Sequence, residues 1–139
     1  MQLLKFKNAS TGSSRKKVLN IVFDVDGTLS GFEGCVTPEL CHELAKKGAV
    51  LWMCSKRNSE TEAEQIENDY GIKPLRLLEG FDYVSIKAQC LRSLKSKVGT
   101  PIVYVGDRLE DQFVADEAGV VYCSPEDLVL KILEHLHLL

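Results

Sequence analysis

The sequence lacks several features that would place it in a special class of protein. No apolar run approaches the about 20 residues that a membrane-spanning helix needs, and the amino terminus lacks the long apolar core of a signal peptide. Charge of one sign is not in excess either, since 17 basic and 20 acidic residues leave a formal net charge of −3. We therefore expect a cytoplasmic protein whose overall charge gives it no membrane or nucleic-acid partner.

Cysteine spacings typical of a metal or redox site are also missing. The five cysteines are scattered and odd in number, without a C-x-x-C pair. Three of them, Cys41, Cys54 and Cys90, fall within apolar patterns, which favours buried free thiols in a reducing compartment. The 139 residues contain no repeat, no low-complexity segment and no internal linker, so we expect one domain over residues 1–139.

Acidic residues are absent before Asp24, and residues 1–17 carry five basic side chains. This segment is expected to be a flexible basic arm, with a short edge strand over residues 2–6 as an alternative. A frayed terminus whose charges only add solubility explains it without a function. An arm that helps to hold an anionic substrate is the functional alternative.

Apolar segments alternate with helical patterns along the rest of the chain. The expected strands cover residues 18–23, 49–54, 101–105 and 120–123, with a further short one at 75–78. The expected helices cover residues 38–47, 60–70, 86–97 and 110–118 and the segment after residue 124. This alternation predicts an α/β fold with a doubly wound parallel sheet and helices on both of its faces.

Polar residues follow three of the expected strands. Asp24 and Asp26 come directly after the first strand, Ser55 follows the second, and Asp107 and Asp111 follow the strand at 101–105. A parallel sheet brings these carboxyl ends to one edge, where open α/β sheets bind ligands. Paired acids at such an edge bind a hard cation or divide nucleophilic and acid–base roles. A solvated acidic turn is the alternative.

Two further features bear on this edge. Alternate residues of a strand point to the same side, so we expect Asp24 and Asp26 to face one site. Lys87 is expected at the start of a helix and within reach of the same edge. A surface lysine without a role is the alternative for Lys87, and an acid that only interacts with the helix dipole is the alternative for Asp111.

At these residues the chain resembles the haloacid dehalogenase (HAD) superfamily of phosphotransferases. The four short motifs of that family are matched, in the family's order, by residues 24–28 (Asp-Val-Asp-Gly-Thr), Ser55, Lys87 and residues 106–111 (Gly-Asp-x-x-x-Asp). The flanking pattern of strands and helices extends the resemblance from about Val18 to the carboxyl terminus. The resemblance implies a HAD-like Rossmann-type domain.

The resemblance also implies a catalytic role for four residues. Asp24 would attack phosphorus and form an aspartyl-phosphate, and Asp26 would protonate the leaving oxygen and then activate water. Ser55 would hydrogen-bond the phosphoryl group, and Lys87 would offset its charge. Asp26 favours phosphate monoester hydrolysis over dehalogenation, because a halide leaving group needs no proton.

A magnesium ion and a set of substrate contacts are implied in the same way. Mg²⁺ would be held by Asp24, the Asp26 carbonyl and Asp107, with Asp111 acting through water or orienting the site. Contacts to the phosphorylated substrate are expected from the backbone N–H groups of Gly27 and Thr28, and from the side chains of Arg57 and Asn58.

The chain departs from many members of the family because it has no room for a cap domain. Only eight residues separate Leu29 from Pro38, and 31 separate Ser55 from Lys87. An open site of this kind needs a cover, which a second copy in a homo-oligomer, a macromolecular substrate or a short flap over residues 30–36 can supply. The sequence does not choose between small-molecule and macromolecular phosphorylated substrates.

Two other classes of protein compete with this interpretation. A receiver-type signalling domain needs a phosphoacceptor aspartate after a central strand and a lysine after the last strand, whereas this chain has Ser55 and Ser124 there. A catalytically silent HAD-fold scaffold is the other alternative, although both Asp24 and Asp26 are present.

Overall fold

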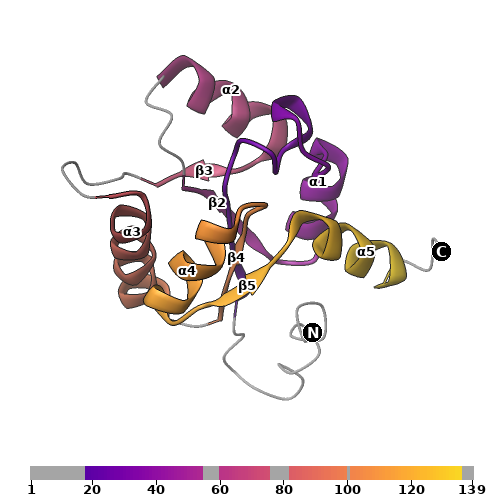
Figure 1. Cartoon of the computed structure of the whole chain (residues 1–139). Coiled ribbons are helices and arrows are strands. Elements are labelled where there is room, and N and C mark those ends of the chain that lie inside the picture. The colour runs from indigo at the N-terminus through magenta and orange to yellow at the C-terminus, as the bar shows by residue number, and fades with distance from the viewer. Residues whose placement is uncertain (1–17, 55–59, 76–81, 100, 136–139) are drawn as a thin grey trace.

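The computed structural model of the chain describes residues 18–54, 60–75, 82–99 and 101–135. Over these residues the chain forms an α/β fold, in which a five-stranded, all-parallel sheet is combined with five α-helices (Figure 1). This arrangement is consistent with a Rossmann-like fold. The expected α/β class and parallel sheet are confirmed, and the calls on residues 1–17 lie outside the described residues.

The elements follow the expected order. The strands are β1 (Asn20–Phe23), β2 (Val50–Met53), β3 (Lys73–Pro74), β4 (Ile102–Val105) and β5 (Val121–Cys123). The α-helices are α1 (Pro38–Lys46), α2 (Glu60–Tyr70), α3 (Tyr83–Val98), α4 (Leu109–Ala118) and α5 (Pro125–His135). A short 3₁₀ helix, η2 (Ser30–Phe32), lies between β1 and α1.

Two elements begin earlier than the sequence predicted. Strand β3 pairs with β2 from Lys73, and the Leu75 N–H donates to the Met53 carbonyl at 2.9 Å, so this pairing begins before the strand predicted at 75–78, of which residues 76–78 lie outside the described residues. Helix α3 begins at Tyr83 rather than Ile86, because Asp82 caps it by accepting from the Ser85 N–H at 2.9 Å. Lys87 therefore lies in the second turn of α3, not at its start.

The strand order β3-β2-β1-β4-β5 places β1 at the centre of the sheet. Phe23, the last residue of β1, is in register with Met53 of β2 and Val105 of β4. The residues that directly follow these three strands therefore lie at the same edge of the sheet: Asp24 after β1, Cys54 after β2 and Gly106 after β4. We call this the carboxyl edge of the sheet.

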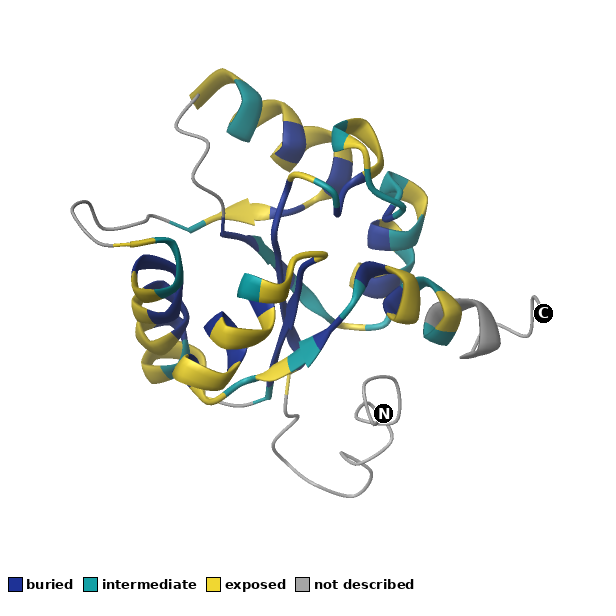
Figure 2. Cartoon of the chain, viewed as in Figure 1, coloured by how far each residue is buried: buried dark blue, intermediate teal, exposed yellow. Residues whose placement is uncertain are grey.

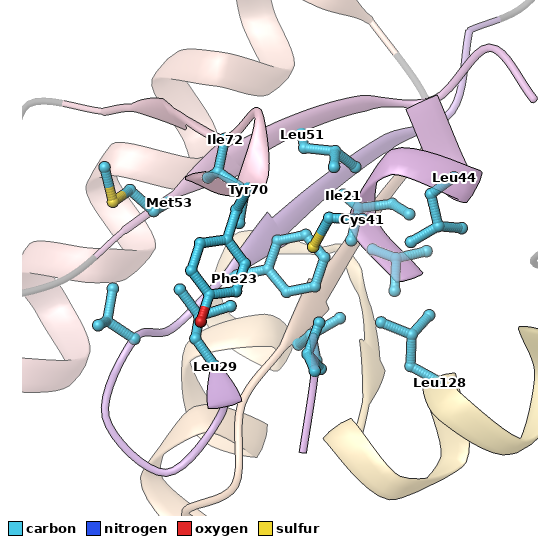
Figure 3. Close-up of a cluster of buried hydrophobic side chains, with 14 of the residues drawn as sticks. Ile21, Phe23, Leu29, Cys41, Leu44, Leu51, Met53, Tyr70, Ile72 and Leu128 are labelled. Atoms are coloured by element: carbon cyan, nitrogen blue, oxygen red, sulfur yellow. The ribbon is translucent and has the colours of Figure 1, made fainter. Parts of the chain in front are cut away.

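Alternate strand residues pack into two separate hydrophobic clusters, as strand geometry requires. Figure 3 shows the first cluster, in which Ile21 and Phe23 of β1 contact side chains from α1, α2 and α5. In the second cluster, Val22 of β1 and Tyr104 of β4 pack with α3 and α4. In Figure 1, α3 and α4 lie to the left of the sheet and α1 and α5 to its right.

Burial follows this division of the strands. The strands β1 and β4 and the inward faces of the helices are buried, while the edge strand β3 and the outer helix faces are exposed (Figure 2). Cys41, Cys54 and Cys90 are buried free thiols, which confirms the prediction for all three. Among the described residues, no helix combines the length and the apolar composition that crossing a bilayer requires.

Candidate functional site

Asp24 is a buried carboxylate at the carboxyl edge, directly after β1. Its residue is 3% exposed, and its backbone N–H donates to the Val105 carbonyl at 2.8 Å, which ties it to β4. The Lys87 ammonium donates to Oδ1 of Asp24 at 2.8 Å. Burial holds the pKa of the Asp24 carboxyl above its ordinary value, although the Lys87 charge acts to lower it.

Lys87 is fully buried, so the structure does not support the alternative of a surface lysine. It lies on the inward face of α3, between the buried residues Ile86 and Ala88. Burial is the largest influence on the pKa of its ammonium and acts to lower it, but the charge and hydrogen bond of Asp24, together with the neighbouring Cys54 and Tyr83, outweigh burial, and the pKa is raised. Lys87 is therefore a fixed positive charge beside Asp24.

Two tyrosines that the sequence analysis missed complete the surroundings of Lys87. Its Nζ donates to the hydroxyl of Tyr83 at 2.7 Å and to the hydroxyl of Tyr104 at 3.1 Å. Two signals in the sequence point to them. Tyr83 lies four residues before Lys87, on the same face of α3, and Tyr104 places a hydroxyl inside an apolar strand, where it needs a partner.

Asp111 is a buried acid in the first turn of α4, held by hydrogen bonds to both of its oxygens. Oδ1 accepts from the Tyr104 hydroxyl at 2.8 Å and from the Tyr83 hydroxyl at 3.2 Å. Oδ2 accepts from the backbone N–H of Arg108 at 3.1 Å. Gly106 leaves space for this carboxylate, because a Cβ there would overlap the Asp111 side chain.

Asp107 is the exposed member of a group of three acids. One carboxylate oxygen from each of Asp24, Asp107 and Asp111 lies within 4.8 Å of the others. Gly27, which has a φ of +74°, packs against Asp107 so closely that a Cβ at this position would overlap the carboxylate. The turn after β1 thus needs glycine both for its conformation and for this approach.

The chemistry of this group fits Mg²⁺. Carboxylate oxygens are the ligands that hard divalent cations prefer. The three acids and Lys87 together carry a net charge of −2 when all four are ionised, which one divalent cation balances. Asp111 already accepts three hydrogen bonds, so it suits the orienting role better than direct ligation.

Asp24 and Asp26 both follow the end of β1, so strand periodicity does not determine how the two acids are oriented. Strand β1 ends at Phe23, and a turn follows, in which the N–H groups of Thr28 and Leu29 donate to the Val25 carbonyl at 3.1 and 3.0 Å. Asp24 is buried and Asp26 is exposed. The turn, rather than strand alternation, determines where the second acid lies.

The predicted phosphate contacts of Gly27 and Thr28 need correction. The Gly27 N–H donates to the Phe32 carbonyl at 2.8 Å and the Thr28 N–H to the Val25 carbonyl, so both groups are used within the fold. The Thr28 hydroxyl is buried and has no hydrogen-bond partner among the described residues. The role of these two residues in the described structure is to shape the turn.

The predicted flap is a structured loop that contacts this turn. Residues 30–36 contain η2, and a bridge joins Leu29 to Val36. The Tyr70 hydroxyl at the end of α2 accepts from the Gly31 N–H at 2.9 Å and lies 3.1 Å from the Ser30 hydroxyl. The loop is thereby held to α2 beside the carboxyl edge.

Three of the predicted site residues, Ser55, Arg57 and Asn58, lie outside the described residues. The others are brought to the carboxyl edge as described above. Comparison of the chain with models of protein families, with curated proteins and with solved structures found no match. The function is therefore argued from the site itself.

Proposed function

We propose that this protein is a magnesium-dependent phosphomonoester hydrolase that acts through an aspartyl-phosphate at Asp24. The observation that carries the proposal is the buried Asp24 carboxylate, with the Lys87 ammonium 2.8 Å from Oδ1 and two further carboxylates beside it. A buried carboxylate paired on one oxygen keeps its other oxygen for attack on phosphorus. The remaining acids can hold the cation that an anionic substrate requires.

The proposal includes a finer description of the fold. We infer a capless HAD-type domain whose parallel sheet is doubly wound, in support of which the helices divide between two hydrophobic clusters. Between β1 and α1 the described chain forms only η2 and a single bridge, and no separate folded unit. The acidic motifs at Asp24 and Asp107 both follow central strands, as the resemblance to the HAD superfamily implies.

In the first step, a carboxylate oxygen of Asp24 forms a bond to phosphorus while the bond from phosphorus to the leaving oxygen breaks. Asp26 gives its proton to that oxygen, and the alcohol leaves. Lys87 offsets negative charge next to Asp24 during this step. The products are an acyl phosphate on Asp24 and an ionised Asp26.

In the second step, water attacks the phosphorus of the acyl phosphate and Asp26 takes the proton of that water. The bond between phosphorus and the Asp24 oxygen breaks, which restores the Asp24 carboxylate and releases inorganic phosphate. The two steps together add one water to one phosphomonoester. Asp26, being exposed, is accessible to the proton of both the alcohol and the water.

Mg²⁺ would be held by Asp24, the Asp26 backbone carbonyl and Asp107, with Asp111 orienting the group. When bound, it reduces the repulsion between the Asp24 carboxylate and an anionic phosphate.

Ser55, Arg57 and Asn58 remain predicted contacts of the phosphoryl group or substrate. A capless site would need a cover, for which a macromolecular substrate or a second copy of the chain remains the prediction. The free thiols Cys41, Cys54 and Cys90 support a cytoplasmic location.

The first experiment compares hydrolysis of p-nitrophenyl phosphate by wild type, Asp24→Asn and Asp116→Asn, with Mg²⁺ and with chelator. We expect magnesium-dependent turnover that Asp24→Asn abolishes and Asp116→Asn retains, because Asp116 is exposed on α4. If wild type gives no turnover, capture of beryllium fluoride in the presence of Mg²⁺ tests whether the site is competent. If the wild type shows neither turnover nor capture, the proposal is overturned in favour of a catalytically silent scaffold.

A further inference from the structure

We propose that Tyr83 and Tyr104 are positioning residues that fix the Lys87 ammonium against Asp24. This inference rests on the proposed function, in which Asp24 is the nucleophile. Both hydroxyls contact Nζ of Lys87, at 2.7 and 3.1 Å, and both contact Oδ1 of Asp111, at 3.2 and 2.8 Å. They therefore lie between the ammonium and the acid of α4.

The hydrogen bonds of Lys87 account for all of its donors. An ammonium has three N–H groups and no acceptor, and the three partners here are Asp24 Oδ1, the Tyr83 hydroxyl and the Tyr104 hydroxyl. Lys87 is fully buried, so water does not compete for these donors from an exposed surface. The ammonium consequently has one preferred orientation, with a single N–H directed at the nucleophile.

The direction of the tyrosine hydrogen bonds follows from the same chemistry. Lys87 can only donate, so each hydroxyl accepts from it and must direct its own single proton elsewhere. Asp111 Oδ1 is an acceptor that both hydroxyls reach. A charged Lys87 cannot accept a hydrogen bond, so its bonds to the two hydroxyls cannot reverse.

The network separates Lys87 from Asp111. The ammonium is 2.8 Å from Asp24 Oδ1 but 3.8 Å from Asp111 Oδ1, beyond hydrogen-bond distance. Without the two hydroxyls, Asp111 Oδ1 would be a carboxylate oxygen that the two remaining N–H groups could approach. The tyrosines thus keep the positive charge of Lys87 on the nucleophile and leave Asp111 oriented by O–H donors.

The two tyrosines differ in burial, and their substitutions are expected to differ in effect. Tyr104 is fully buried in β4, so Tyr104→Phe leaves one N–H of Lys87 without a partner, and water does not reach this position to replace the hydroxyl. Tyr83 is half-buried at the start of α3, with the Arg108 guanidinium 5.1 Å from its ring centre. In Tyr83→Phe, a water molecule can take the place of the lost hydroxyl.

The kinetic test uses Tyr104→Phe and Tyr83→Phe, with Tyr122→Phe as the matched control. The Tyr122 hydroxyl donates to the Gly106 carbonyl at 2.7 Å, so the control removes a comparable hydrogen bond on the neighbouring strand. We expect Tyr104→Phe to lower kcat for p-nitrophenyl phosphate about tenfold relative to the control, and Tyr83→Phe about threefold, with KM within about twofold of wild type. A kcat of Tyr104→Phe equal to that of the control would overturn the proposal.

A second measurement does not depend on activity. In protein labelled with ¹⁵N-lysine, a buried and fully bonded ammonium should give a slowly exchanging NH₃⁺ signal, which Lys87→Met identifies by its loss. Tyr104→Phe should speed proton exchange of that signal about tenfold, and Tyr122→Phe should leave it unchanged. Unchanged exchange in Tyr104→Phe overturns the positioning role. Absence of turnover in wild type instead bears on the proposed function, and the exchange rates still decide this inference.

Discussion

Lys87 shows at the scale of one residue how the site depends on burial. Taking an ammonium and a carboxylate out of water is costly, and their attraction offsets that cost only with good geometry and further hydrogen bonds. Lys87 has both, with Asp24 at 2.8 Å and two tyrosine hydroxyls on its other protons. The pair is therefore far more sensitive to the loss of one partner than an exposed ion pair would be.

Replacing Lys87 by Met should destabilise the protein in a pH-dependent way. The pKa of Asp24 is already above its ordinary value of 3.8 because of burial, and loss of Lys87 raises it further. A carboxyl group whose pKa is higher in the folded state than in the unfolded state stabilises the fold at pH values below its unfolded pKa. This stabilisation is lost as the pH rises through its folded pKa. We expect Lys87→Met to lose about 3 kcal/mol relative to wild type at pH 8 and clearly less at pH 4.

Urea unfolding of both proteins in chelator, from pH 4 to pH 8, measures this difference. Lys46→Met is the matched control, because Lys46 is an exposed lysine of α1. An Lys87→Met deficit that stays constant or shrinks as pH rises would contradict the assignment of a buried ion pair with Asp24. The control should differ little from wild type at every pH.

The loop between β1 and α1 is the element on which the site geometry most directly depends. Its turn places Asp24 inside and Asp26 outside, and its glycines permit two close approaches. A Cβ at Gly27 would overlap Asp107, and a Cβ at Gly34 would overlap the Thr28 backbone. The loop is therefore packed against Asp107, which follows β4, and its own N–H groups are used to hold its shape.

Tyr70→Phe should loosen this loop. The substitution removes the hydroxyl that accepts from the Gly31 N–H at 2.9 Å and contacts Ser30. We expect the free energy of unfolding to fall by about 1 kcal/mol and the Gly31 amide to exchange faster with solvent. Hydrogen exchange followed residue by residue tests this, with the amides of β1 as internal controls. Equal protection of Gly31 in both proteins would show that the Tyr70 contact does not hold the loop.

At the scale of the whole molecule, the acids of the site lie where the strands of one sheet end. The strand order puts β1 between β2 and β4, so segments separated by more than 80 residues, such as those at Asp24 and Asp107, meet at one edge. The unfolded chain cannot hold these carboxylates together. A cation bound by the group therefore stabilises the folded state by mass action.

Adding Mg²⁺ should accordingly raise Tm, and the shift should grow with the logarithm of its concentration once the site is filled. Asp107→Asn should reduce the shift, because it removes a carboxylate of the proposed site. Asp116→Asn, which changes an exposed acid on α4, should retain it. Thermal unfolding followed by circular dichroism provides the measurement. An equal Mg²⁺ shift in both variants would place the bound cation elsewhere.

The sequence alone determined the class of fold and pointed to the acids and to Lys87, but not to the two tyrosines around Lys87. Periodicity predicted four of the five strands, and turn residues after them identified Asp24, Asp26, Asp107 and Asp111. Helix α1 begins at Pro38, as predicted, where the Thr37 side chain caps it by accepting from the Leu40 N–H. These features are local, because strand length, capping and turn formation depend on residues close together in the chain.

Only the tertiary structure decided how the site residues pair. The partners of Lys87 come from β1, α3 and β4, and their meeting depends on strand order and on the rotation of α3 about its axis. The N–H groups of Gly27 and Thr28, which the sequence offered to phosphate, are by contrast used by local hydrogen bonds to Phe32 and Val25. The spacing of residues in a sequence motif indicates which groups lie near a site. The orientation of those groups depends on packing between elements that are distant in the chain.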